Sequence, residues 1–557
     1  MPSSSRMRVL SLFGAMVVLA ILLLAAHAPI FLNDGVMMDD WLVLQLRPDD
    51  PIDLSFLIKG AGHPVFFVYS WFANMTGAPV AVMVVMTVLA ILAGAICFAL
   101  AALRSGLLSR TEAIGVALLV WTYPGYQMWA GKANAVYVFS FGLFFVATWL
   151  LTLAFDAKGL RRVALRAATA LAFFVSFALN SLMVLYVFAM FGLFVAVWQA
   201  NGREQGSIRR LVLSAWRCAA GYPELVVLPL VYWGALNIWF KRSGDYAGYY
   251  GIRLPSFSDL LVGWRSFFQM GYIDVLARAS RMAMDYRLLF VLAVVLLVIA
   301  AAMLALRSER PRLSVSRIAP PLCLGLLLFV ALALPYLIAG IRPNQHFYET
   351  RHLLLFGLPA AFVVLSGKRL LESFVGERGA FAGAFGLALM VSVAALWSSY
   401  IFLQARVLKQ EALSSHLALM PMPSATVFDL DDGFYDHSPR HVPFGIAEVT
   451  GMLRLAWGDQ PFFGFSLVGE RPTVLQEMEL SRTAKGSAYR HIDLSGPQAT
   501  ISLQPGPAAA PNAVLVRHYY ACRLLARCDV AAFLKELAIV KVDIGPIAGV
   551  TPLEKSK

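Results

Sequence analysis

The sequence predicts a polytopic α-helical membrane protein with about 11 transmembrane helices, followed by a soluble α+β domain. Two observations support this prediction. Of the 557 residues, 59% are hydrophobic and only 14% are charged, whereas about a quarter of the residues of a soluble protein are charged. Long apolar runs recur over residues 1–404, and in residues 405–557 the apolar fraction falls while Pro and Gly become frequent.

The first apolar run covers residues 9–32. It is too long for the core of a signal peptide and has no clear small-residue cleavage site, so we interpret it as an uncleaved first span. Two of the later runs flank Asn180 and are short enough to form a tight hairpin, which would leave the side of every later loop unchanged. The ten further runs, each long enough to cross roughly 30 Å of hydrocarbon, lie at about 79–104, 111–129, 133–155, 164–179, 181–199, 220–240, 287–306, 318–341, 352–367 and 379–404.

Basic residues predict the orientation, because they collect in the cytoplasmic loops of membrane proteins. In this chain they occupy alternate short loops, so the N-terminus is predicted to be cytoplasmic, and loop 33–78 and the C-terminal domain periplasmic, in a bacterial inner membrane. The net charge of +13 is then a topology signal and not a nucleic-acid site. The residues concerned are Arg6, Arg8, Arg104, Arg110, Lys158, Arg161, Arg162, Arg166, Arg203, Arg209, Arg210, Arg217, Arg307, Arg310, Arg312, Arg317, Lys368, Arg369 and Arg378.

The C-terminal region reads as a small α+β module. Alternating stretches at 425–428 and 513–516 suggest strands, and a helix is expected near 529–538. Cys522 and Cys528 are spaced for a disulfide in an oxidising compartment. Zinc is the alternative there, but no His stands at a clean spacing from the pair, so we do not expect a metal.

Residues 429–433 (Asp-Leu-Asp-Asp-Gly) resemble part of a calcium loop. The bidentate Glu that an EF-hand places later in its loop is missing. A turn after a strand is therefore the favoured interpretation.

An acidic cluster directly after the first span is the main catalytic candidate. It contains Asp34, Asp39 and Asp40, and the last two lie between the apolar residues Met38 and Trp41. A carboxylate that faces inward there would be desolvated and more basic, as a catalytic base requires. The alternative is an N-cap of a helix that begins at Trp41, and one Asp could cap while the other acts as base.

The loop at 342–352 offers cations on the same predicted face. Arg342, His346, Arg351 and His352 could bind the phosphate of a lipid-linked substrate. The alternative is that Arg and Tyr side chains anchor the following span at the interface.

Lys132 is a further cationic candidate, in the turn between two apolar runs. It could reach a lipid phosphate, while Tyr123, Tyr126 and Trp129 could stack on a sugar. The alternative is an aromatic belt with a snorkelling lysine. His63, which precedes Pro64, is a weaker substrate-contacting candidate, because a His before Pro is often structural.

Together these features resemble the type-C (GT-C) glycosyltransferases. The shared features are a first span, an outside loop with an acidic pair and Trp41, His63-Pro64 about twenty residues on, about ten more spans, and a periplasmic C-terminal domain. The resemblance implies a polyprenyl-phosphate-linked sugar donor. It also implies that a carboxylate of the first outside loop acts as base or positions the acceptor, which carries over to Asp39 or Asp40, with Asp34 as a helper.

We therefore expect sugar transfer to a cell-envelope glycan, lipid or protein on the periplasmic face. A divalent metal ion could bind the acidic pair, but a metal-free base is simpler. An O-antigen polymerase or ligase would fit the membrane bulk, yet would require neither the acidic cluster nor the large C-terminal domain. A transporter should bury ionisable residues within several spans, which the apolar runs lack, and a noncatalytic assembly protein leaves the outside polar clusters without a role.

Overall fold

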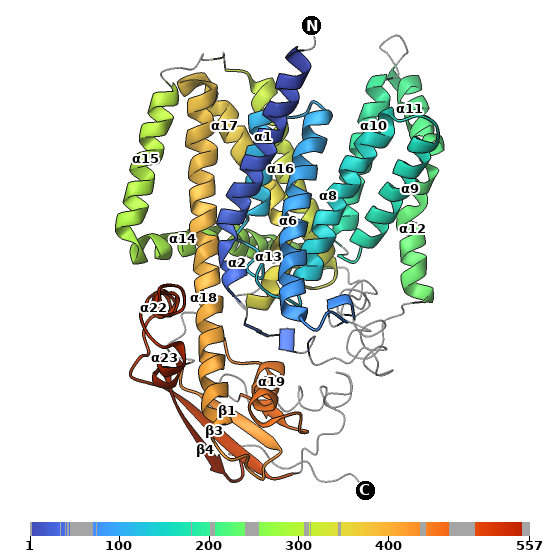
Figure 1. Cartoon of the computed structure of the whole chain (residues 1–557). Coiled ribbons are helices and arrows are strands. Elements are labelled where there is room, and N and C mark those ends of the chain that lie inside the picture. The colour runs from blue at the N-terminus through green and yellow to red at the C-terminus, as the bar shows by residue number, and fades with distance from the viewer. Residues whose placement is uncertain are drawn as a thin grey trace.

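The computed structural model describes residues 3–33, 35–38, 40–41, 44, 71–73, 75–179, 181–200, 207–239, 255–305, 311, 313–343, 347–434, 442–466 and 496–547. Within these residues the chain forms a bundle of apolar helices with a small mixed α/β layer beyond one end (Figure 1). Five helical stretches are long and apolar enough to span a membrane, or six if the bent pair at 212–238 counts as one span. The helices of the bundle are α1 (Ser3–Ala26), α2 (Ala28–Leu32), α6 (Pro79–Arg104), α7 (Arg110–Trp121), α8 (Ala135–Asp156), α9 (Gly159–Ser176), α10 (Leu182–Ala200), α11 (Ser207–Gly221), α12 (Pro223–Ile238), α15 (Arg287–Ala305), α16 (Val315–Ile338), α17 (Gly357–Ala380) and α18 (Gly386–Ala418).

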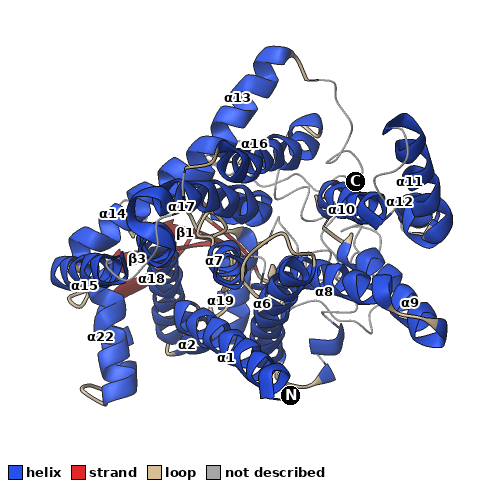
Figure 2. Cartoon of the chain, turned by 90° about the horizontal axis from the view of Figure 1, so that it is seen from above, coloured by secondary structure: helices blue, strands red, loops and turns tan. Residues whose placement is uncertain are grey.

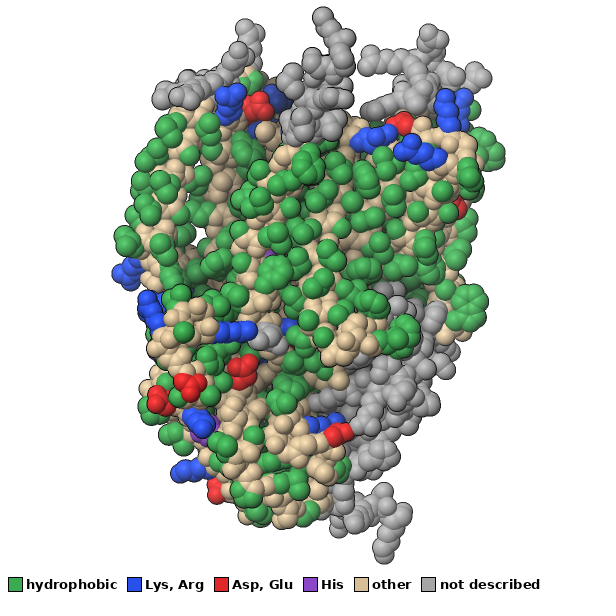
Figure 3. All heavy atoms as spheres, viewed as in Figure 1, with side chains coloured by type: hydrophobic (Ala, Val, Ile, Leu, Met, Phe, Trp, Pro, Cys, Tyr) green, Lys and Arg blue, Asp and Glu red, His purple; other side chains and the backbone are tan. Residues whose placement is uncertain are grey.

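Each of the eleven predicted apolar runs overlaps at least one of these helices, although fewer than eleven meet the length test. Seen from above, α9–α12 stand at one side of the bundle and α15 at the other (Figure 2). Hydrophobic side chains cover the middle of the visible face, with charged side chains above and below (Figure 3). The N-terminus and the C-terminal domain lie at opposite ends (Figure 1), as expected for a chain that crosses a membrane an odd number of times.

The predicted sidedness can be tested with reporter fusions. We expect an enzyme that is active only in the periplasm to be active when fused after Pro421, where α18 has ended, and inactive when fused near Arg209. A reporter that is active only in the cytoplasm should give the opposite pattern. Reversed activities at the two positions would refute the orientation.

The predicted run at 111–129 differs most from the structure. Helix α7 ends at Trp121 and has 12 residues, which is about 18 Å and too short to cross the hydrocarbon alone. Pro124 and Gly125 follow directly and break the helix. The segment after α7 instead folds into a buried turn that connects to α8.

Helix α17 continues beyond the predicted end of its run at residue 367. Two charged residues of this continuation, Lys368 and Glu372, are buried and paired with each other. The Lys368 ammonium lies 3.4 Å from the Glu112 carboxylate and also pairs with Glu372, while Arg369 contacts Glu112 at 2.8 Å. These charges join α7 to α17 at the end of the bundle opposite the C-terminal domain, and no apolar pattern could have revealed them.

Three short helical elements lie between the predicted apolar runs 220–240 and 287–306. They are α13 (Phe257–Phe268), the π-helix η3 (Gln269–Ile273) and α14 (Asp274–Asp285). Arg278 of α14 is fully buried. Its guanidinium pairs with Asp274 at 3.0 Å and donates to Ser399 Oγ at 2.7 Å and to the Pro124 carbonyl at 2.8 Å, so it joins α14, α18 and the turn after α7.

The C-terminal domain is built on a four-stranded sheet with the order β2-β1-β3-β4. β1 pairs in parallel with β2 and β3, and β3 pairs antiparallel with β4. The elements are β1 (Val427–Asp432), α19 (Ile446–Trp457), β2 (Phe463–Phe465), β3 (Gln498–Pro505), α22 (Asn512–Leu525), α23 (Val530–Leu537) and β4 (Ala538–Ile544). The domain boundary drawn at residue 405 falls inside α18, whose lower half forms part of this core.

Two predicted elements of this domain are confirmed, and a third prediction is wrong. The strand at 425–428 and the helix near 529–538 correspond to β1 and α23. The expected strand at 513–516 lies in α22, because Leu515, Val516 and Tyr519 form one buried helix face after Pro511. A four-residue apolar run cannot distinguish the two periodicities. Residues 429–433 are the end of β1 and its turn, as favoured over a calcium loop.

Candidate active site

Of the acidic residues in the first outside loop, the structure describes Asp40, and this residue is buried. Its exposed fraction is 1%. Carboxylate oxygen Oδ1 accepts from the Ala133 backbone N–H at 2.6 Å, and Oδ2 accepts from the Met37 N–H at 3.3 Å. Asp40 accepts from the backbone N–H three residues earlier, as the third helical residue of a capping box does. An N-cap side chain accepts instead from a backbone N–H two or three residues later, so this bond is not that of an N-cap.

Burial gives this carboxylate an unusual pKa. Desolvation raises the pKa of Asp40 to about 6, although the nearby Lys132 ammonium and the backbone N–H groups of Ala133 and Met37 oppose the rise. A carboxylate with a pKa near 6 is ionised at neutral pH and is a stronger base than an exposed aspartate. Asp40 is therefore desolvated, as the sequence indicated, and its role as a base stays a prediction.

Lys132 lies beside Asp40 and is buried with it. Its ammonium donates to the Gly35 carbonyl at 2.6 Å and, at 3.3 and 3.5 Å, to the carbonyl and the side-chain oxygen of Asn33. An ammonium has three donors, so these bonds tie the segment after the first span to the turn before α8. In this arrangement Lys132 holds the loop that carries Asp40.

A third segment of the chain packs against the turn before α8. The 3₁₀-helix η4 (Phe347–Phe356) contributes Thr350, whose Oγ1 accepts from the Gln127 N–H at 3.2 Å. The next residue, Arg351, is half-buried. Burial raises the pKa of Tyr126 well above its ordinary value; the Asp40 carboxylate adds to the rise and the Arg351 guanidinium opposes it. Asp40 and Arg351 therefore both lie close enough to the Tyr126 phenol to interact with it electrostatically.

The C-terminal domain holds the loop from the opposite side, through Glu448 of α19. Glu448 is buried and its Oε1 accepts from the Met38 N–H at 2.9 Å and from Gln410 Nε2 at 2.6 Å. Arg406 of α18 binds both carboxylate oxygens, at 2.8 and 2.5 Å. Burial acts to raise the pKa of Glu448, but Arg406 and the backbone donors outweigh it and hold the pKa below its ordinary value. A fixed anion of the soluble domain thus fastens the backbone two residues before Asp40.

Gly35 and Met38 show how closely this loop follows α18. A Cβ built on Gly35 would lie 2.1 Å from Val407 Cγ1, so only glycine fits there. Met38 has a φ of +50°, in the left-handed region that non-glycine residues rarely adopt. The Trp41 indole N–H adds a bond of 3.3 Å to Gln410. Asp40 is therefore set on a tightly packed turn and not on an open loop.

The three aromatic candidates are core residues of this structure. Tyr123, Tyr126 and Trp129 are each at most 3% exposed. The Tyr123 hydroxyl donates to the Gly271 carbonyl at 2.9 Å, and the Trp129 indole N–H donates to the Tyr123 carbonyl at 3.1 Å. No face of these rings is open for a sugar here, and their role in substrate contact remains a prediction.

The remaining candidates lie apart or outside the described residues. Arg342 forms an exposed ion pair with Asp259 at 2.8 Å. His352 is buried, with its ring centroid 4.7 Å from that of Tyr336. The candidates Asp34, Asp39, His63 and His346 lie outside the residues that the structure describes.

The structure also places residues here that sequence reasoning missed. His27, between α1 and α2, is buried and shares a 2.6 Å hydrogen bond with the Tyr400 hydroxyl, and its other ring nitrogen lies 2.8 Å from the Trp121 carbonyl. A lone His at the end of an apolar run was the available signal. Glu448, Arg406 and Gln410 gave none, because they lie roughly 400 residues from the loop they hold.

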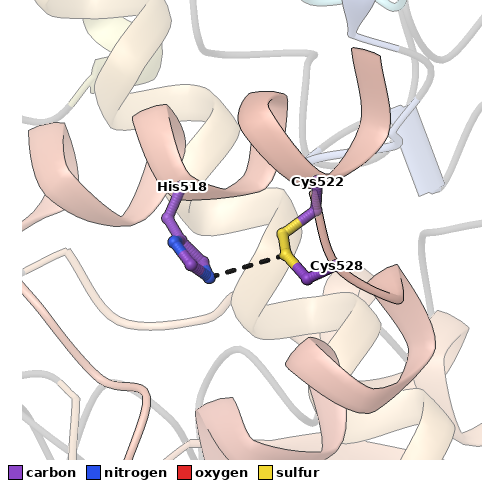
Figure 4. A group of neighbouring side chains, drawn as sticks. All are labelled: His518, Cys522 and Cys528. Atoms are coloured by element: carbon purple, nitrogen blue, oxygen red, sulfur yellow. Dashed lines mark hydrogen bonds between the residues drawn. A yellow bond between two sulfur atoms is a disulfide. The ribbon is translucent and has the colours of Figure 1, made fainter. Parts of the chain in front are cut away.

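The structure joins Cys522 and Cys528 by a disulfide, which is the pairing that the sequence predicts. His518 lies one helical turn before Cys522 on α22, and its Nε2 is 3.7 Å from Cys528 Sγ (Figure 4). The sequence-based prediction against a metal considered only the short spacings of common zinc motifs, whereas a helix brings His518 and Cys522 together at the i, i+4 spacing.

No protein-family model matches the sequence, and no curated protein matches it significantly. Solved structures that resemble it include those of two proteins. The arabinofuranosyltransferase AftD from Mycobacteria matches with a TM-score of 0.40 and 16% identity, over 91% of this chain and 36% of AftD, so the chain spans about a third of that protein. ArnT from Cupriavidus metallidurans bound to undecaprenyl phosphate matches with a TM-score of 0.35 and 12% identity, over 99% of this chain and 100% of ArnT. Its apo state gives a TM-score of 0.30. At these values the likeness concerns the course of the chain.

Proposed function

We propose that this protein transfers a sugar from a polyprenyl-phosphate-linked donor to a hydroxyl-bearing acceptor of the cell envelope, with Asp40 as the base. One observation carries the proposal: a buried carboxylate with a pKa of about 6 lies at the junction of the apolar bundle and the C-terminal domain, and both it and the Arg351 guanidinium act electrostatically on the Tyr126 phenol. A lipid-linked phosphate presents its charge at the depth of the headgroups, which is where such a junction lies.

The chemistry assigns one role to each group. Asp40 removes the proton of the acceptor hydroxyl while the acceptor oxygen bonds to the anomeric carbon of the sugar. The bond from that carbon to the phosphate oxygen breaks, and the polyprenyl phosphate leaves with the electron pair. Arg351 stabilises the negative charge that develops on this phosphate. Lys132 and Glu448 touch neither substrate; they position the loop that carries Asp40.

Donor binding tests the role of Arg351. We expect Arg351→Gln to weaken binding of polyprenyl phosphate to the purified protein by roughly tenfold or more, because a charge-assisted contact to phosphate is lost. The measurement is a titration of the lipid followed by thermal shift or tryptophan fluorescence, alongside transfer of labelled sugar from lipid-linked donors to envelope extract.

Arg342→Gln is the matched control. It removes a guanidinium from the same stretch of chain, but one that already pairs with Asp259 on the surface, so lipid binding should change less than threefold. Equal losses of lipid binding in the two variants would contradict the role of Arg351 as the phosphate-binding residue. Wild-type protein that neither binds polyprenyl phosphate nor transfers sugar would refute the proposed function.

A further inference from the structure

His518, Cys522 and Cys528 form a cluster of metal-ligating side chains in the C-terminal domain, away from the site described above. One ligand atom from each lies within 4.8 Å of the other two. His518 and Cys522 share one face of α22, and Cys528 returns to that face because Ala526, with φ of +50°, ends the helix in the left-handed conformation (Figure 4). The His518 ring packs against Phe533, with centroids 5.1 Å apart, which fixes the direction of the imidazole.

The spacing of the atoms suits zinc. In a tetrahedral zinc site with bonds of about 2.3 Å to sulfur and about 2.0 Å to nitrogen, a sulfur and a nitrogen ligand lie about 3.5 Å apart. His518 Nε2 and Cys528 Sγ lie 3.7 Å apart. Two thiolates and an imidazole are ligands that zinc prefers over calcium or magnesium. His518 is exposed and Cys528 half-exposed, so an ion can reach the cluster from solvent, and a fourth position stays open for water.

We propose that these three residues bind Zn²⁺ when the disulfide is reduced, so that the disulfide and the zinc complex are alternative states of one site. An external dithiol breaks the S–S bond: its own sulfurs become a disulfide, and two electrons and two protons pass to Cys522 and Cys528. Zn²⁺ then displaces these two protons, which go to solvent, and His518 supplies a neutral ring nitrogen. Only the sulfur–sulfur separation must widen, to about 3.8 Å. The proposal does not depend on the proposed function.

Metal analysis of the full-length protein in detergent tests this directly. The protein is treated with dithiothreitol, freed of it by anaerobic gel filtration, incubated with ZnCl₂ and desalted. We expect reduced wild type to retain about one zinc ion per chain more than the untreated protein. Co²⁺ in place of Zn²⁺ should give a thiolate-to-cobalt charge-transfer band in the reduced protein alone.

Three variants define the ligands. Cys522→Ser/Cys528→Ser should lose the additional zinc and the cobalt band, while Cys97, Cys218 and Cys323 remain as the thiol background. His518→Ala keeps both cysteines and should weaken zinc binding by roughly tenfold or more. His416→Ala, an exposed histidine of the same domain that lies 3.0 Å from the Lys535 carbonyl, should bind zinc like wild type.

Two results would overturn the proposal. One is reduced wild type, with its thiols shown to be free by labelling, that retains no more zinc than the double Ser variant. The other is His518→Ala with the same zinc affinity as His416→Ala. Because His518→Ala leaves the disulfide intact, the second comparison holds even where the double variant fails to fold.

Discussion

Asp40→Asn should lower sugar transfer by roughly 10²-fold or more, because the amide cannot accept the proton of the acceptor hydroxyl. The substitution keeps the size of the side chain. Its remaining oxygen can still accept the 2.6 Å bond from the Ala133 N–H, whereas the 3.3 Å bond from the Met37 N–H to the second oxygen is lost. The measurement is steady-state transfer of labelled sugar by purified protein. Binding of polyprenyl phosphate should stay near that of wild type.

The pH dependence of activity is an independent test of the same residue. The Asp40 pKa of about 6 predicts that activity rises with pH through 6 and levels off above it, because only the ionised form acts as base. The stability effect has the opposite sign. Since the folded-state pKa is raised, the stability that this group contributes is present below its unfolded pKa of about 4 and is lost as pH rises through about 6. At pH 7.5, Asp40→Asn should therefore unfold no more easily than wild type.

Transfer by Asp40→Asn at the wild-type rate, with the same rise through pH 6, would show that another group is the base. Asp39→Asn serves as the neighbouring comparison, because the sequence offered Asp39 and Asp40 as equal candidates. If only Asp39→Asn is inactive, the base is Asp39 and Asp40 is a structural carboxylate.

Glu448→Gln should destabilise the protein by about 3–5 kcal/mol, the usual cost of leaving a buried charge without its partner. The glutamine still offers an oxygen to the Met38 N–H, but the Arg406 guanidinium remains buried opposite a neutral group. We expect a lower unfolding temperature and, because Met38 precedes Asp40 by two residues, reduced transfer as well. Thermal unfolding followed by tryptophan fluorescence and the transfer assay give the two readouts.

Asp459→Asn is the matched control for this prediction. It also removes a carboxylate that lies near an arginine of α19, but Asp459 and Arg454 are 3.9 Å apart and the Asp459 side chain is 62% exposed. Exposed pairs contribute about 0–1 kcal/mol, so this variant should unfold and turn over like wild type. Equal stability of Glu448→Gln and Asp459→Asn would contradict the role given to the buried pair.

The sequence predicted what depends on local pattern and missed what depends on long-range packing. Apolar runs located the helices of the bundle, and the position of Asp40 between Met38 and Trp41 was enough to predict a desolvated carboxylate. Pro124 and Gly125 also signal a helix break, but the apolar composition of residues 111–129 favoured one continuous span. Glu448, by contrast, is an ordinary first-turn glutamate of α19, and nothing near it in the sequence points to the first outside loop.

The aromatic candidates show the same limit. Tyr123, Tyr126 and Trp129 have the composition of a sugar platform and equally that of a core. What decides is whether another segment covers them, and here η3 and η4 do so through contacts such as that of Gly271 with Tyr123. Such cover comes from residues more than 140 positions away, so residue type alone could not choose between the two roles.

Helix α18 is longer than the hydrocarbon layer of a bilayer is thick. Its 33 residues make a rod of about 50 Å, whereas the hydrocarbon of a bilayer is about 30 Å thick. The surplus of about 20 Å does not separate the two parts of the protein, because the lower part of the helix packs inside the C-terminal domain. The domain therefore rests on the end of the bundle, where Glu448 binds the Met38 N–H. Since one unbroken helix enters both parts, a displacement of the domain would have to tilt α18 within the bundle as well.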